Sequence, residues 1–241
     1  MVRSRAVSRR LLVAMLATFA VASGCAAESS PGSVAEAVPP DVAVEAAPDT
    51  QPGPSTDLAA PGAPDAAAAR ELLEVLPVQP EQSEGYDRKR FSHWDRLPNG
   101  CSVREQVLID ESRGPAQVDP FGCKVVAGDW ISVYDGVATS DPAELDIDHV
   151  VALAEAWRSG AHGWDDARRR AFANDLADPD TLVAVTSSSN RSKADHDPAH
   201  WLPDALDHCT YAATWVRIKA TWSLSVDPAE RAALLQILDG C

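Results

Sequence analysis

The sequence has little positive charge. It carries 21 Lys and Arg against 36 Asp and Glu, so its formal net charge is −15 over 241 residues. A protein that holds nucleic acid by its overall charge needs surplus Lys and Arg to neutralise phosphates. The composition therefore argues against that class of nucleic-acid binder, and any such partner would need a local source of positive charge.

Long hydrophobic runs are also missing. The apolar stretch 11–22 follows four arginines within the first ten residues. As a helix it would rise only about 18 Å, short of the roughly 30 Å core of a bilayer. This pattern favours an export signal over residues 1–24 rather than a transmembrane anchor. Because Ala22-Ser23-Gly24-Cys25 resembles a bacterial lipobox, we expect cleavage before Cys25. The product would be a cell-surface lipoprotein anchored only through a lipid on Cys25, or a secreted protein.

Aromatic residues are absent between residues 26 and 80, where Ala, Pro, Ser, Asp and Glu dominate. Such a segment cannot bury enough apolar surface to offset the entropy lost on ordering. We therefore expect a disordered tether over 25–84, with at most a short, marginal helix near 66–76. All seven Trp and all six His lie after residue 84, which predicts a folded domain over 85–241. That length is enough to bury about 68–70% of the unfolded surface.

Cysteine is scarce, with five residues in the chain. Removing Cys25 leaves Cys101, Cys123, Cys209 and Cys241. In an exported domain four cysteines predict two disulfides, with three connectivities open. We favour the pairing of near neighbours, Cys101 with Cys123 and Cys209 with Cys241. Zinc ligation is the alternative, but no pair has the C-x₂₋₄-C spacing of zinc sites.

The hydrophobic pattern predicts strands before helices. Residues 104–110, 123–127 and 130–134 have the composition of short strands, and a further strand is expected from 145. Helical spacing covers 151–159 and 165–176, a strand-like run covers 181–185, and two helices are expected over 204–223 and 227–239. This order indicates an α+β domain.

Two segments carry candidate catalytic residues. In Asp146-Ile147-Asp148-His149, a strand would place the two aspartates on one face, with the histidine where the strand ends. Carboxylates suit a hard cation, and a neutral imidazole can take a proton from water. In the second segment a β-type run gives way to Asn190-Arg191-Ser192-Lys193, which offers an amide carbonyl and two cations.

Together the two segments resemble the ββα-metal (HNH) nuclease fold, in which a β-hairpin carries Asp-His and a following helix carries a His or Asn ligand. Their order is that of the HNH domains of CRISPR effector nucleases. The surroundings at 86–88, 148–157, 172–176 and 201–203 resemble exported bacterial HNH endonuclease family proteins of a GmrSD-like branch. The resemblance covers about 86–241 and implies an HNH core with added N-terminal strands and C-terminal helices.

The resemblance implies a role for each matching position. His149 would be the general base that activates water. Asp148 and Asn190 would be ligands of a divalent metal, Mg²⁺ or alternatively Mn²⁺. Asp146 would be a further ligand or a partner of one.

Two cations near the proposed ligands, Arg191 and Lys193, would contact substrate phosphate. The chain departs from the family in its spacing, since 41 residues separate His149 from Asn190 and hold a helical insertion. Thr181 stands where many relatives carry the middle Asn of the HNH motif.

These expectations combine into an exported metal-dependent endonuclease that hydrolyses phosphodiester bonds of DNA, with RNA as an alternative substrate. The domain over 85–241 has a net charge of −9, so we expect a monomer that binds nucleic acid transiently and with low sequence specificity. Two alternatives remain: a non-catalytic cell-surface binding module on a nuclease fold, and a zinc-dependent hydrolase of wall material.

Overall fold

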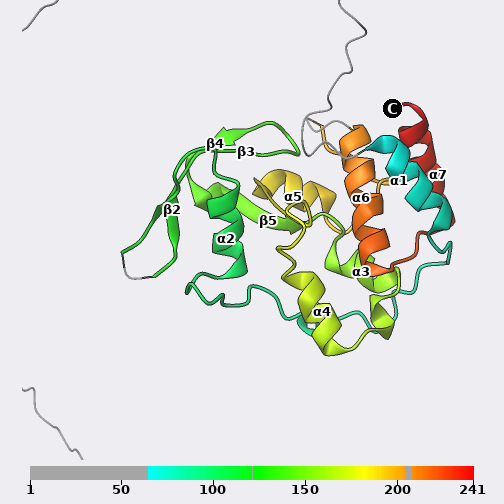
Figure 1. Ribbon diagram of the computed structural model, residues 1–241, viewed down its shortest axis with the longest axis horizontal. Helices are drawn as coiled ribbons and strands as arrows, with labels where there is room; N and C mark the ends of the chain where they lie inside the picture. The colour runs from blue at the N-terminus through cyan, green and yellow to red at the C-terminus, as the bar shows by residue number, and fades with distance from the viewer. Residues whose placement is uncertain (1–64, 121, 205–207) are drawn as a thin grey trace, which may run out of the picture. The chain divides into compact units, whose positions relative to one another are not determined.

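The computed structural model describes residues 65–120, 122–204 and 208–241 (Figure 1). The expected signal at 1–24, the lipidation site Cys25 and the tether up to residue 64 lie outside the described residues. Within those ranges, no helix is both long enough and apolar enough to cross a bilayer.

The described part of the chain combines helices with three small antiparallel sheets, each of two strands, which agrees with the expected α+β class. The helices are α1 (Ala66–Val75), α2 (Val103–Asp110), α3 (Leu153–Arg158), α4 (Asp166–Ala173), α5 (Ser187–Lys193), α6 (His208–Trp222) and α7 (Pro228–Asp239). The strand pairs are β1 (Gln117–Val118) with β2 (Val125–Ala127), β3 (Trp130–Ile131) with β4 (Ala138–Thr139), and β5 (Leu145–His149) with β6 (Leu182–Thr186).

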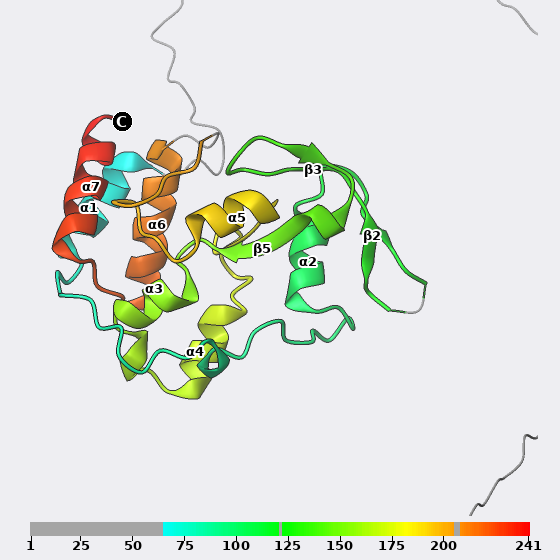
Figure 2. The same ribbon diagram turned by 180° about the vertical axis from the view of Figure 1, so that it is seen from behind.

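The β5–β6 hairpin lies between two hydrophobic cores. Val183 and Val185 belong to the core formed with α1, α3, α6 and α7, whereas Leu182 and Ala184 belong to the core beside α2, β2 and β3. Figures 1 and 2 show the same arrangement from both sides, with α1, α6 and α7 at one end of the domain, α2 and the short strands at the other, and β5 and α5 between them. All five residues of β6 are buried, so the hairpin is held on both faces.

Helix α1 places the start of the folded unit before residue 85, the boundary expected from composition. Leu73 is fully buried in the core with α6 and α7, and Ala69 lies one turn earlier on the same face. Asp65 caps the helix by accepting from the Ala67 amide. The helix is stabilised by this packing, which average composition does not reveal.

The segment 104–110, expected as a strand, is instead helix α2. Ser102 caps it by accepting from the amide of Glu105, and the apolar Val103, Val107 and Leu108 share the face that enters the core. The Ser-x-x-Glu spacing was the signal for a helix start, and it outweighs the strand-like Val-Leu-Ile run.

The remaining elements follow the expected order with shifted ends. Of the strand expected over 130–134, only Trp130–Ile131 pairs, because Ser132 begins a tight turn that includes Gly136 at φ 70°. Strand β4 after this turn was not foreseen. Asp165 caps α4 and Asp227 caps α7 within a capping box, as the sequence favoured for both positions. Helix α6 begins at His208, and residues 205–207 of the expected helix lie outside the described residues.

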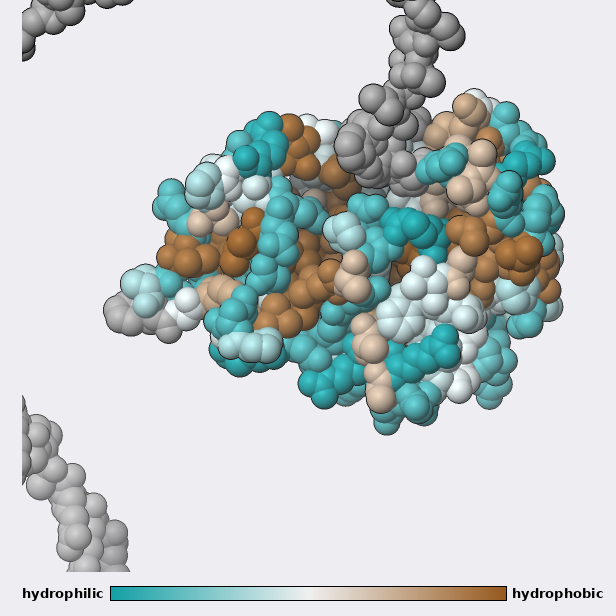
Figure 3. Space-filling model, viewed as in Figure 1, coloured by the Kyte–Doolittle hydropathy of each residue, from teal (hydrophilic) through white to brown (hydrophobic). Residues whose placement is uncertain are grey.

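Both predicted disulfides are confirmed, Cys101 with Cys123 and Cys209 with Cys241. The first joins the start of α2 to the β1–β2 hairpin, and the second joins the first turn of α6 to the end of the chain. Figure 3 shows the surface of the domain as a mosaic of hydrophilic and apolar groups. Large exposed apolar side chains occur on the small hairpins, among them Val126, Ile131 and Val137.

Candidate functional site

The hairpin β5–β6 and helix α5 form a strand–strand–helix unit. The strands pair without a break from Leu145 opposite Thr186 to His149 opposite Leu182. Thr186 ends β6 and also caps α5, since its hydroxyl accepts from the Ser189 amide. The segment 150–181, with α3 and α4, is inserted between the two strands. The unit therefore has the ββα order that the motifs implied.

Helix α5 faces the two aspartates of β5. Asp146 and Asp148 lie two residues apart on one face of the strand, and Asn190 and Lys193 lie one turn apart on the helix. The spacings are similar, about 6.6 Å along the strand and about 5 Å along the helix. As a result, each aspartate has its own partner on α5.

Asp148 is buried and held through one oxygen. Its Oδ2 accepts from the Tyr134 hydroxyl at 2.8 Å and from the Lys193 ammonium at 2.7 Å. Burial raises the pKa of the Asp148 carboxyl, while the positive charges of Lys193 and Arg88 act in the opposite direction. The other oxygen, Oδ1, accepts no hydrogen bond from the described residues. One carboxylate oxygen is therefore left for a ligand.

Asn190 is oriented by Asp146. The Asn190 amide nitrogen donates to Asp146 Oδ2 at 3.0 Å. Because a carboxylate can only accept, this bond assigns the nitrogen and leaves the amide oxygen directed elsewhere. Asn190 lines the cavity beside Asp148, whereas Asp146 does not line it. The structure thus places Asp146 behind Asn190 as its partner, and not among the groups facing the cavity.

His149 is buried with a defined tautomer. Its Nε2 lies 3.0 Å from the carbonyl oxygen of Ala173. A carbonyl cannot donate, so Nε2 carries the proton and Nδ1 keeps its lone pair. Burial lowers the pKa of His149 to about 3, so the ring is neutral near pH 7. Its ring stacks on Phe172 at 6.2 Å between centroids, which holds the imidazole in place.

A cavity of about 450 Å³ brings the main predicted residues together, since Asp148, His149 and Asn190 all line it. One oxygen of the Asp148 carboxylate and the oxygen of the Asn190 amide are candidate donors there. These donors fit Mg²⁺, which proteins commonly hold with one or two carboxylates while waters and substrate phosphates complete the shell. Asp148 and Asn190 are therefore the residues of this site that could hold the metal.

The two expected phosphate contacts have different surroundings. Arg191 is exposed and lines the cavity. Lys193, in contrast, is fully buried, with its ammonium on Asp148 Oδ2 and on the backbone oxygen of His149. A buried, paired ammonium is not accessible to a substrate, so the structure corrects Lys193 from a phosphate contact to a partner of Asp148. The i, i+3 spacing from Asn190 was the signal for this inward position.

Sequence reasoning missed three contributors to the site. Tyr134 comes from the turn after β3, and the Ala173 carbonyl comes from the end of α4. No spacing rule connects either of them to the Asp-His motif. Arg88 also lines the cavity and comes from the segment that precedes both motifs in the chain. In the sequence, only the presence of Tyr86-Asp87-Arg88 in the family resemblance pointed to this arginine.

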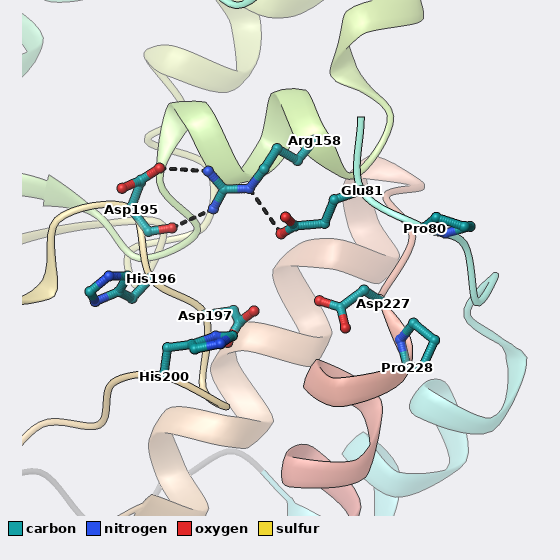
Figure 4. Close-up of a pocket in the computed structure, with 9 residues that line it drawn as sticks. All are labelled: Pro80, Glu81, Arg158, Asp195, His196, Asp197, His200, Asp227 and Pro228. Atoms are coloured by element: carbon teal, nitrogen blue, oxygen red, sulfur yellow. Dashed lines mark hydrogen bonds and ion pairs between the residues drawn. The ribbon is translucent and has the colours of Figure 1, made fainter. Parts of the chain in front are cut away.

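A second cavity of about 630 Å³ adjoins the first, and Asp195 lines both. Figure 4 shows Arg158 bridging Asp195 and Glu81 on its wall. Carboxylate oxygens of Glu81, Asp197 and Asp227 lie within 4.8 Å of one another. Because its wall is acidic and Arg158 is already paired, this cavity would repel a phosphate backbone. The cavity at Asp148 remains the candidate site.

Comparisons with known proteins found similarity to a nuclease-family domain and to a secreted protein. Residues 122–237 match the family described as the C-terminal domain of GmrSD restriction endonucleases. The chain is also 40% identical over 183 residues to an uncharacterized secreted protein of the fungus Arthroderma benhamiae, a match that covers 75% of this chain and 88% of the relative. No solved structure matches significantly. The chain therefore belongs to the same family as this secreted fungal protein, and its residues 122–237 are similar to the C-terminal domain of GmrSD restriction endonucleases.

Proposed function

We propose that this chain is an exported, metal-dependent endonuclease that hydrolyses phosphodiester bonds of nucleic acid, with DNA as the first substrate to test. The observation that carries the proposal is the common cavity of His149, Asp148 and Asn190. The family match supports a nuclease, because the matched domain comes from restriction endonucleases.

His149 acts as the general base. Its Nε2 proton is held by the Ala173 carbonyl, so the ring presents an unprotonated Nδ1 that can take a proton from water. The Phe172 ring and the carbonyl fix the imidazole plane. Asp148 and Asn190 would hold a divalent metal, which when bound would supply positive charge to stabilise the charge that develops on the phosphate and the leaving oxygen.

Export is supported by two observations. The relative is named a secreted protein, and two disulfides need an oxidising compartment to persist. The proposal includes either free secretion or a lipid anchor at Cys25. An acidic, exported domain suits a monomer that binds its substrate briefly, cuts at low sequence specificity and releases it.

The experiment incubates the full chain with supercoiled plasmid, and separately with labelled RNA, in Mg²⁺, Mn²⁺ or EDTA. We expect metal-dependent nicking that falls by about 10²–10⁴-fold in His149→Ala. The matched control is His162→Ala, because the His162 ring also bonds a backbone carbonyl but lies outside the cavity.

Two outcomes would refute the proposal. One is the absence of nicking with either metal in the wild-type chain, and the other is full activity in His149→Ala. Nucleic-acid binding without cleavage under every condition would favour the alternative of a non-catalytic binding module.

A further inference from the structure

Two arginines lie on the wall of the catalytic cavity without a carboxylate partner. Arg88, in the short 3₁₀ helix Arg88–Arg90, and Arg191, in α5, are both exposed and both line the cavity with Asp148, His149 and Asn190. In the described part of the chain neither forms an ion pair, whereas eight other arginines there do. Arg88 also hydrogen-bonds the Tyr86 side chain, but neither guanidinium is neutralised by a carboxylate of the described residues, so in this acidic protein the two form a local positive site.

Arg88 is exposed, yet its backbone is firmly anchored. Phe91, three residues later, is fully buried, and its ring lies 6.4 Å from those of Trp157 and Phe172. Tyr86, two residues earlier, packs on Trp157 at 6.2 Å. Aromatic anchors on both sides therefore hold Arg88 at the cavity, which is unexpected for a side chain that serves only as solvated surface.

Arg88 is close enough to Asp148 and His149 to interact with both electrostatically. Burial is the main influence on the pKa of both Asp148 and His149, raising the first and lowering the second. The positive charge of Arg88 lowers the pKa of each of these groups. Because Arg88 lines the same cavity as Asp148 and His149, an anion bound at Arg88 would lie close to this pair.

We propose that Arg88 and Arg191 together form a phosphate subsite that binds the nucleic-acid backbone beside the catalytic residues. The inference rests on the proposed endonuclease function and deepens it. A guanidinium presents planar, paired donors that match phosphate oxygens, which an ammonium does not. Arg88 precedes the region matched by the family, residues 122–237, so the subsite combines that domain with the segment before it.

The test separates binding from cleavage. Binding of a short labelled DNA duplex is measured by fluorescence anisotropy at several salt concentrations, with full-length chains that also carry His149→Ala. Arg88→Ala is compared with Arg88→Lys and with Lys89→Ala, which removes an equal charge one residue away at a position that does not line the cavity. Thermal unfolding of each variant is recorded in parallel.

Arg88→Ala is expected to weaken binding by about tenfold, the effect of losing a hydrogen bond to a charged group. The slope of log K against log salt should become shallower by about one unit. Arg88→Lys should restore the slope but only part of the affinity. In the active chain, Arg88→Ala should raise KM more than it lowers kcat.

Three results would overturn the subsite. Equal binding by Arg88→Ala and Lys89→Ala would do so while leaving the endonuclease proposal intact, provided that the wild-type chain cuts plasmid. An unfolding temperature well below that of the parent would show that Arg88 is structural. A wild-type chain that neither binds nor cuts nucleic acid would overturn both proposals.

Discussion

Lys219 is the buried cation on which α3, α6 and α7 converge, and its removal gives the sharpest stability prediction. The side chain is fully buried, and its ammonium lies 2.7 Å from Glu155 Oε1 and 2.7 Å from Glu230 Oε2. It also donates to the Ser159 hydroxyl and to the Ser225 carbonyl, each at 3.0 Å. Lys219→Met would leave Glu155 paired only with Arg158 and would leave the buried Glu230 carboxylate without a cation.

The expected cost follows from this geometry. Removing one partner of a buried ion pair destabilises a protein by about 3–5 kcal/mol, because the remaining charge stays buried and unpaired. For a domain of this size each kcal/mol lowers the unfolding temperature by about 2–4 °C. We therefore expect Lys219→Met to lower it by about 10 °C near neutral pH.

The loss of stability caused by Lys219→Met should become smaller as the pH falls. In the wild-type protein burial raises the pKa of Glu155, but the Lys219 ammonium, the Ser159 hydroxyl and Arg158 together lower it to about 2. Burial raises the pKa of Glu230 to about 7 even though Lys219 acts to lower it. Removing the ammonium therefore raises the pKa of both carboxyls, and that of Glu230 rises further above its unfolded value of about 4.5. Between about pH 5 and 7 the folded variant would then bind a proton that its unfolded state releases, so its stability rises as the pH falls.

Urea unfolding followed by circular dichroism, without reductant and at both ends of this pH range, measures the effect. Lys89→Met is the matched control because Lys89 is exposed. A loss below about 1 kcal/mol at neutral pH would refute the account of the buried pair. So would a loss of the same size at both pH values.

Three further predictions follow from the site and its supports. Tyr134→Phe removes one of the two donors to Asp148 Oδ2 and should weaken Mn²⁺ binding by about tenfold or more. Electron paramagnetic resonance of the free ion measures the affinity, and an unchanged affinity would show that Lys193 alone positions the carboxylate. Replacing Cys209 and Cys241 by Ala opens a 32-residue loop and should cost about 2–4 kcal/mol in urea unfolding, and no loss would contradict the role of this disulfide. Burial raises the pKa of Glu111 to about 7, so this group makes the stability of the fold decrease as the pH rises from about 4.5 through 7. Glu111→Gln should flatten that part of the profile of stability against pH, and an unchanged profile would refute the raised pKa of Glu111.

The proposed catalytic unit was largely predictable because its information is local. The Asp-His motif at the end of one strand, and Asn190 in a helix directly after another, follow from the side-chain periods of strands and helices. The α+β class and both disulfide pairs were also predictable, since each pair joins cysteines within one region of the chain. Helix α2 was expected as a strand but could have been predicted as a helix, because the spacing of Ser102 and Glu105 is typical of a helix start.

The supports of the site could not be predicted, because they join residues whose distance depends on packing. Tyr134 reaches Asp148 from a turn that begins at Ser132, within the strand expected over 130–134, and the Ala173 carbonyl reaches His149 only because the insertion between the strands folds back. The i, i+3 spacing from Asn190 indicated an inward position for Lys193, but the pairing of its ammonium with Asp148 depends on packing.

By itself, then, the sequence determined which residues are chemically able to act and in what order they follow the strand–strand–helix unit. Only the tertiary structure decided which of them face the cavity and which hold the others in place. Asp146 orients Asn190, Lys193 neutralises Asp148, and Arg88 joins the cavity from more than a hundred residues before Asn190. The physical reason is that burial and pairing are set by elements distant in sequence, whereas periodicity and capping are set by neighbours along the chain.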